Sequence, residues 1–144
     1  IHTILAHGLL DNTQIGIARN QQILITGTDY TPLTDKNSLE AELNQILNTY
    51  NTIQNPYDKA VYIHNNLAYL QYFIDINKRT SRFIQNISLM NDNKLPLILR
   101  EEYINNYIDG LISYYETGSY DKYKQFFIQN YTKIANLLNE LKNS

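Results

Sequence analysis

The chain has no cysteine and no tryptophan, and its 144 residues include one methionine and three prolines. Without cysteine there is no disulfide, no thiolate-bound zinc and no thiol nucleophile, a composition typical of a reducing cytoplasm. No apolar run approaches the roughly 20 residues that cross a bilayer, and the first ten residues carry neither a basic leader nor a cleavage pattern. We therefore expect a cytoplasmic protein with no membrane partner.

Charge of either sign is also sparse. Lys and Arg number 12 and Asp and Glu number 14, so the formal net charge is −2. Basic residues form no broad stripe, which argues against nucleic acid as a partner. Hydrophobic residues make up 43% of the chain, enough for one core, and the length suits a single domain over residues 1–144.

Apolar residues recur at helical spacing over most of the chain, which predicts a mostly α fold. Asn55 is placed to cap a helix with Pro56 at its first position, and Asn37 with Glu40 resembles a capping box. Gly118 is placed to end a helix. The expected helices cover residues 1–10, 39–50, 56–70, 79–90, 104–115 and 123–141.

One stretch departs from the helical period. Ile23 and Ile25 flank Leu24 between polar neighbours, and Gly27 with Thr28 reads as a turn. We predict a short exposed β-hairpin over residues 15–33. Such an edge can take up an extended peptide through backbone hydrogen bonds, and the alternative is a structural flap without a ligand.

Residues 71–82 gather Asp, Asn, Lys and two Arg between two helical patterns. They predict a loop that enters a helix N-terminus, where free N–H groups and the helix dipole favour an anion such as phosphate. Arg79 and Arg82 lie one turn apart and could both reach phosphate oxygens. Asp75 adds a hard oxygen ligand suited to Mg²⁺ shared with a nucleotide. The alternative is a solvated basic helix face.

These residues resemble the motif of the Fic/Doc (filamentation-induced-by-cAMP/death-on-curing) family, His-x-Phe-x-(Asp/Glu)-Gly-Asn-Gly/Lys-Arg-x-x-Arg, found between two central helices. The expected hairpin and the helices after Pro96 are similar to those of family members, so the resemblance spans nearly the whole chain. It implies a Fic-type helical bundle with a hairpin flap before the motif helices. The motif positions that match are Phe73, Asp75, Asn77, Lys78, Arg79 and Arg82.

The resemblance also implies an activity. Most family members are nucleotidyltransferases that move AMP from Mg-ATP to a hydroxyl of a target protein (AMPylation, or adenylylation). On this basis Asp75 would hold Mg²⁺ and Phe73 would anchor the loop in the core. The nucleotide would be bound by Ile76, Asn77, Lys78, Arg79 and Arg82. The target segment would lie on the flap at Ile23, Leu24, Ile25, Thr26 and Gly27.

Two positions depart from the motif. Gln71 stands at the position of the catalytic His, and an amide cannot act as a base near neutral pH. Ile76 replaces the Gly that lets the loop approach the phosphates. Gly permits positive φ angles, which a β-branched residue such as Ile resists. His64 lies about two helical turns before Gln71, on the order of 10 Å away, and we interpret it as a packing residue.

We therefore expect a Fic-family adenylyltransferase scaffold whose transfer activity is reduced or lost. One alternative is a phosphotransferase of the Doc type, suggested by the sequence Lys78-Arg79-Thr80 and by Ile76. Another is a non-catalytic module that binds nucleotide or peptide. The chain lacks the (Ser/Thr)-x-x-x-Glu-(Gly/Asn) inhibitory helix of many family members, so restraint would come from a separate inhibitory protein or from upstream residues.

Overall fold

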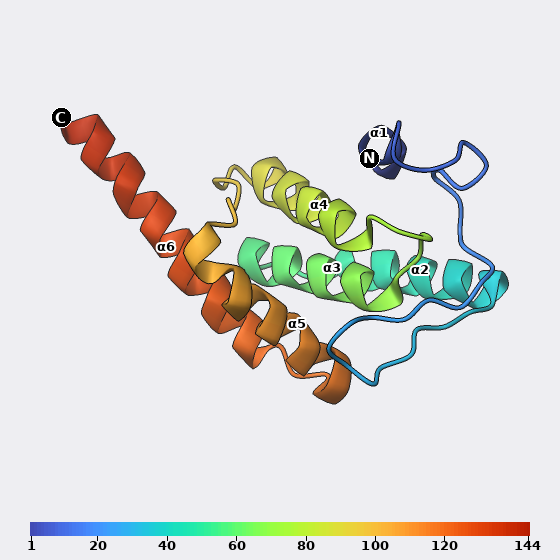
Figure 1. The fold of residues 1–144 in the computed structure, drawn as a ribbon. Coiled ribbons are helices and arrows are strands. Elements are labelled where there is room, and N and C mark those ends of the chain that lie inside the picture. The colour runs from blue at the N-terminus through green and yellow to red at the C-terminus, as the bar shows by residue number, and fades with distance from the viewer.

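A computed structural model describes residues 1–144, which fold into six α-helices and one short 3₁₀ turn (Figure 1). The helices agree closely with the predicted ones from residue 36 onward, whereas the first is only five residues long. Their bounds are α1 His2–Ala6, α2 Lys36–Tyr50, α3 Pro56–Leu70, α4 Asn77–Asn91, η1 Glu101–Tyr103, α5 Ile104–Thr117 and α6 Asp121–Asn143.

Helix α3 lies at the centre of the bundle and contacts α2, α4, α5 and α6. One side of α3 packs on α2 through a small cluster that includes Leu39 and Ile63. The other side belongs to the main core, which is rich in aromatic residues of α5 and α6, among them Tyr107, Tyr123 and Phe126. The predicted mostly helical fold is confirmed, and α3 leads directly into the motif loop.

Helices α5 and α6 pack closely because Gly110 has no side chain. A Cβ atom there would lie 2.9 Å from Cα and 3.0 Å from N of Tyr123, and backbone cannot give way as a side chain would. Helix α6 then continues past the other helices, so its C-terminal end stands clear of the bundle (Figure 1). No helix is long and apolar enough to cross a membrane.

Two helix starts are capped by side chains. Asn55 Oδ1 accepts from the amides of Tyr57 and Asp58, as predicted. At α2 the cap is Asp35, whose carboxylate accepts from the amide and hydroxyl of Ser38. The predicted capping box at Asn37 is therefore wrong, because an acceptor two residues earlier already bonds the first turn.

The predicted β-hairpin over residues 15–33 is not present, since the chain contains no strand. The segment is an irregular loop that passes the C-terminal end of α3 and lies beside α5 (Figure 1). Gly27 approaches Ile112 of α5, and the Thr28 hydroxyl donates to Glu116. Tyr30 stacks on Tyr69 with ring centroids 4.2 Å apart.

Arg19 ties the loop to the end of α3. Its buried guanidinium donates to the carbonyls of Gln71 (2.6 Å), Gln21 (2.9 Å) and Leu33. The Arg19 amide donates to the Tyr72 carbonyl at 3.0 Å. One side chain thus bonds one backbone carbonyl on each arm of the loop and a third at the end of α3.

Candidate phosphate site at the motif loop

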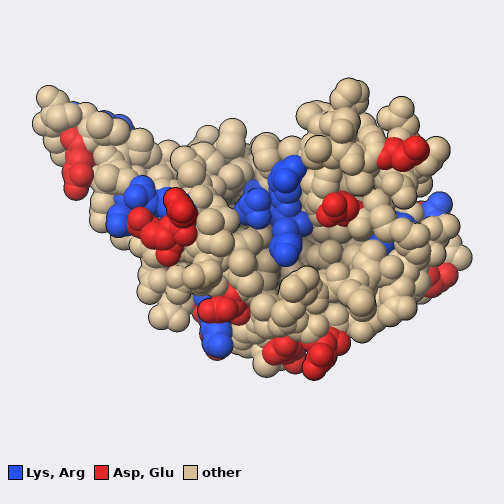
Figure 2. All heavy atoms as spheres, viewed as in Figure 1, with Lys and Arg blue, Asp and Glu red and all other residues tan.

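The residues predicted for catalysis, nucleotide and metal come together in one cavity of about 460 Å³ at the junction of α3 and α4, whereas none of the predicted flap residues 23–27 lines it. Lys and Arg side chains gather over α4 at the centre of one face, with an acidic side chain beside them (Figure 2). Leu9, from the N-terminal segment, is a lining residue that the sequence did not suggest. The lining residues are Leu9, Gln71, Asp75, Ile76, Asn77, Lys78, Arg79 and Arg82.

The N-terminus of α4 has no side-chain cap, a feature that it shares with α5 and α6 but not with α2 and α3. Its cap residue is Ile76, which carries no acceptor. The first amides of the helix therefore keep their donors free beside the cavity, and the helix dipole adds partial positive charge. Arg79 and Arg82 project from the same turn, and neither takes part in an ion pair within the chain. A bound anion would accept hydrogen bonds from the free amides and would pair with the two arginines.

Asn77 shapes the loop through its side chain. Its Oδ1 accepts from the Phe73 amide at 2.9 Å and its Nδ2 donates to the Phe73 carbonyl at 2.8 Å. Both ends of the Asn77 amide are thus engaged within the loop. Asn77 can meet an anion through its backbone N–H, while the side chain holds the loop closed around that position.

Asp75 is exposed at the cavity. Its Oδ1 accepts from the Ile76 amide at 2.6 Å, and its other oxygen has no partner in the protein. No group of three or more His, Asp or Glu side chains is close enough to hold a metal by itself. One carboxylate fits the way Mg²⁺ is usually held, by one or two protein oxygens and substrate phosphates.

Ile76 adopts the left-handed conformation, with φ 64° and ψ 18°. The expectation that a β-branched residue would avoid positive φ is wrong here, because the helices on either side fix the path of the loop. The residue retains the backbone geometry that Gly would adopt, at the cost of local strain.

Gln71 ends α3, also in a left-handed conformation with φ 50°. Its side chain is turned back onto the helix, where Nε2 donates to the Ala68 carbonyl at 2.6 Å, and the residue is only 7% exposed. At the wall of the cavity, this amide offers no proton acceptor of useful basicity.

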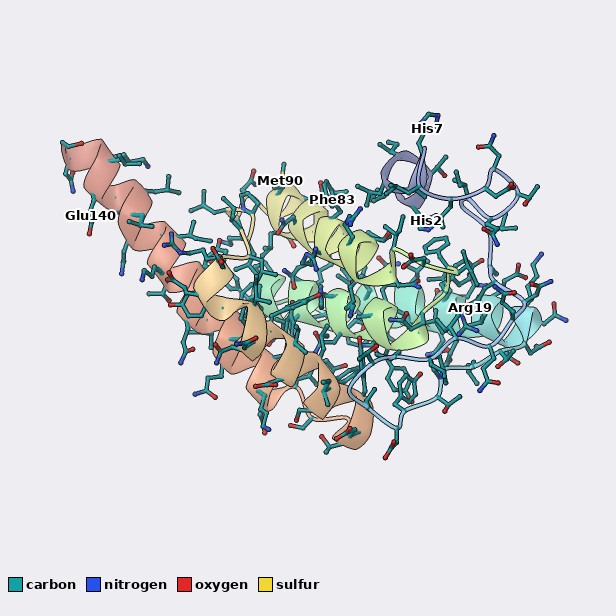
Figure 3. The ribbon with its side chains drawn as sticks, in the orientation of Figure 1. His2, His7, Arg19, Phe83, Met90 and Glu140 are labelled. Carbon is teal, nitrogen blue, oxygen red and sulfur yellow. The ribbon has the colours of Figure 1, made fainter.

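The histidines differ in their surroundings. His64 is fully buried, bonded to Asn65 and Tyr107, and burial lowers its pKa to about 3, which agrees with a packing role. His2 is a residue that sequence reasoning missed. It stacks on Phe73 with centroids 3.7 Å apart, donates from Nε2 to the Asp75 carbonyl and accepts from the Gly16 amide. Its side chain extends from the first residue of α1 toward the motif loop (Figure 3).

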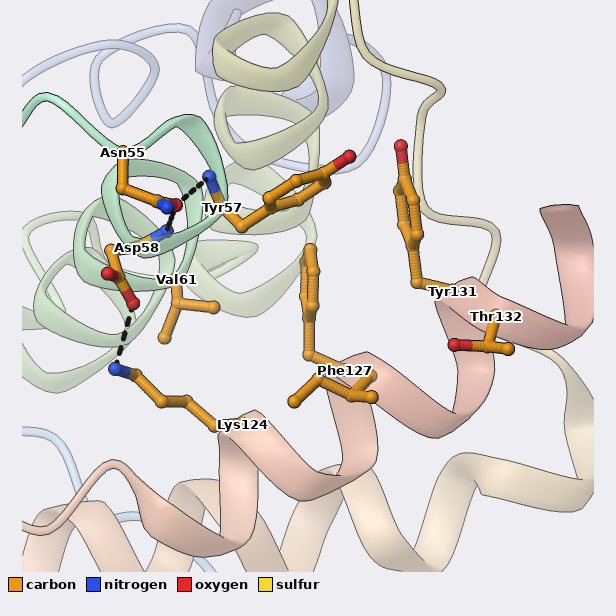
Figure 4. A pocket seen from close by; sticks show the side chains of 9 residues that line it. Asn55, Tyr57, Asp58, Val61, Lys124, Phe127, Tyr131 and Thr132 are labelled. Carbon is orange, nitrogen blue, oxygen red and sulfur yellow. Dashed lines mark hydrogen bonds and ion pairs between the residues drawn. The ribbon is translucent and has the colours of Figure 1, made fainter.

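Further cavities border the bundle. An apolar groove of about 410 Å³ shares Arg79 and Arg82 with the motif cavity and includes exposed Phe83 and Met90, on the outer side of α4 (Figure 3). A third cavity lies between the start of α3 and α6, beside the ion pair of Lys124 with Asp58 at 2.8 Å (Figure 4). It contains no predicted site residue.

The fold and the motif loop define a helical protein in which an uncapped helix N-terminus and two arginines without ion pairs meet at the junction of α3 and α4. The Fic/DOC family model matches residues 1–89, which include the whole motif. The chain belongs to the Fic/DOC family.

A solved structure titled "Fic-1 (aa134 - 508) from C. elegans" is similar in fold, with a TM-score of 0.73 and 20% identity. The match covers 96% of this chain and 40% of that one, so the chain spans less than half the length of that structure.

Proposed function

We propose that the motif cavity binds Mg-ATP and that the chain is an AMP-transfer scaffold whose activity is weakened by Gln71. The observation that carries the proposal is the uncapped N-terminus of α4 beside Arg79 and Arg82, neither of which pairs with an acid of the chain. Family membership supports an enzyme of the AMP-transfer type.

Each residue of the cavity has a distinct part in this proposal. The backbone amides at the start of α4 and the two arginines bind the phosphates. Asn77 keeps the loop closed through its two bonds to Phe73. Asp75 would hold Mg²⁺, which neutralises phosphate charge when bound.

The transfer step would form a bond between a target hydroxyl oxygen and the α-phosphorus, and would release pyrophosphate as the bond to the leaving oxygen breaks. The hydroxyl proton needs an acceptor. Gln71 cannot take it, and general-base catalysis contributes on the order of 10²- to 10⁴-fold in rate. We expect a correspondingly slow transfer.

Residues 23–27 are proposed to receive the target segment. They form no strand and none of them lines the motif cavity, while Leu24 is 82% exposed. Open backbone donors and acceptors in this stretch could pair with an extended peptide. Arg19 and the stacking of Tyr30 on Tyr69 would hold the segment in place beside α5.

The experiment compares transfer of label from α-labelled and γ-labelled ATP to proteins in a lysate. Label from α-labelled ATP, weak with the unaltered chain and stronger with Gln71→His, would support the proposal. His is among the residues that tolerate the left-handed conformation found at position 71. Transfer of the γ label would instead indicate a Doc-type phosphotransferase. No label with either chain, despite binding of Mg-ATP, would refute AMP transfer.

A second candidate is a non-catalytic nucleotide-binding module. Gln71 favours it, because its amide cannot act as a base and its Nε2 already donates to the Ala68 carbonyl. High activity of the unaltered chain would exclude this candidate.

A further inference from the structure

Arg82 is held by a tyrosine. Its Nη1 donates to the Tyr107 hydroxyl at 3.4 Å, and its guanidinium carbon lies 5.5 Å from the centroid of the Tyr107 ring. No Asp or Glu of the chain pairs with Arg82. The orientation of this guanidinium therefore depends on how the Tyr107 hydroxyl is itself oriented.

His64 orients that hydroxyl. Its Nδ1 lies 3.2 Å from Oδ1 of Asn65, an oxygen that can only accept, so Nδ1 carries the proton. The unprotonated Nε2, 3.2 Å from the Tyr107 oxygen, must then accept the hydroxyl proton. The lone pairs of the Tyr107 oxygen are left for Arg82. Burial, together with nearby Arg82, keeps the His64 pKa low enough for the ring to stay neutral.

The side chains around Tyr107 are tightly packed. The His64 ring stacks on Tyr123 with centroids 4.8 Å apart, and the Tyr123 hydroxyl donates to Gln85 at 2.7 Å. Tyr107 also packs edge-on against Phe126. All of these side chains are buried. A fixed hydroxyl can hold one guanidinium geometry at little entropic cost when a ligand binds.

We propose that Tyr107, oriented by His64, is a positioning residue that aims Arg82 at the phosphate in the motif cavity. The inference rests on the proposed nucleotide site and deepens it. Loss of one charge-assisted hydrogen bond, weakened by its length of 3.4 Å, predicts an affinity for Mg-ATP about three- to tenfold weaker in Tyr107→Phe.

Calorimetric titration with Mg-ATP tests the inference. Tyr123→Phe is the matched control, because it removes a buried hydroxyl beside the same imidazole without touching Arg82. We expect Tyr107→Phe to weaken binding and Tyr123→Phe to leave it within about twofold. In an Arg82→Ala background, Tyr107→Phe should cause no further loss of affinity for Mg-ATP, because its effect passes through Arg82. The positioning role would be overturned if Tyr107→Phe lost as much affinity in the Arg82→Ala background as in the unaltered chain, or if Tyr123→Phe lost as much as Tyr107→Phe.

A second measurement needs no nucleotide. The nitrogen chemical shifts of the His64 ring should report the Nδ1–H tautomer between pH 5 and pH 8, and the Nε2–H tautomer would overturn the proposed orientation of Tyr107. Failure of the unaltered chain to bind Mg-ATP would refute the proposed function, and with it the nucleotide role of Tyr107, even if the Nδ1–H tautomer is found. Failure of the proposed nucleotide site and failure of the proposed orientation of Tyr107 would therefore give different results.

Discussion

Replacing Arg19 with Ala should release the loop that precedes the motif. The guanidinium donates to three backbone carbonyls on two separated segments, and the side chain is buried. Charge-assisted hydrogen bonds contribute about 1.5 kcal/mol each at the low end of their range, so together the three stabilise the docked loop by about 4.5 kcal/mol. Arg19→Lys should recover only part of this, since one ammonium cannot match the planar fork of a guanidinium.

Cleavage by chymotrypsin after Tyr30 provides the assay. Tyr30 is half-buried, stacks on Tyr69 and donates from its hydroxyl to the Tyr69 carbonyl at 2.9 Å, so the protease needs the loop to open. We expect Arg19→Ala to raise the cleavage rate at least about tenfold. Arg100→Ala, which removes an exposed arginine paired with Glu102, is the control and should change nothing. Equal rates for Arg19→Ala and the unaltered chain would refute the role given to Arg19.

Three further predictions concern stability, measured by urea unfolding. Ile76→Gly should raise the free energy of unfolding by about 1 kcal/mol, because it relieves a β-branched residue at φ 64°, and a decrease would contradict the strain argument. Gly110→Ala should lower it by about 2 kcal/mol through the clash with the Tyr123 backbone, and an unchanged midpoint would count against that contact. Between pH 6.5 and pH 5 the unfolded chain takes up a proton at His64 that the folded protein, with a pKa of about 3, does not. As the pH is lowered through this range, the free energy of unfolding should therefore fall with a slope that approaches about 1.4 kcal/mol per pH unit near pH 5, whereas a flat profile would show that His64 is accessible to protons in the folded state.

Helices with local signals could be predicted from the sequence. Asn55 and Pro56 define the start of α3, and Gly118 ends α5 in the left-handed conformation with φ 73°. These signals act between residues a few positions apart, so a single sequence contains them. The position of the motif residues at one helix junction could be predicted for the same reason, because they span only twelve positions of the sequence.

Long-range bonds explain what the sequence did not reveal. The run from Ile23 to Ile25 has strand propensity, yet the loop is fixed by Arg19 and the carbonyl of Gln71, which lie 52 residues apart. His2 reaches Asp75 across 73 residues. No local pattern indicates such partners, because only the packed fold brings them together.

The central claim is that the uncapped start of α4 and its arginines bind the phosphates of Mg-ATP. Calorimetric titration of Mg-ATP into the unaltered chain and into Arg79→Ala tests it most directly, with Arg100→Ala as a control for loss of an arginine elsewhere. We expect binding by the unaltered chain and the control, and a large loss of affinity in Arg79→Ala. Equal affinity in all three, or no binding in any, would contradict the account.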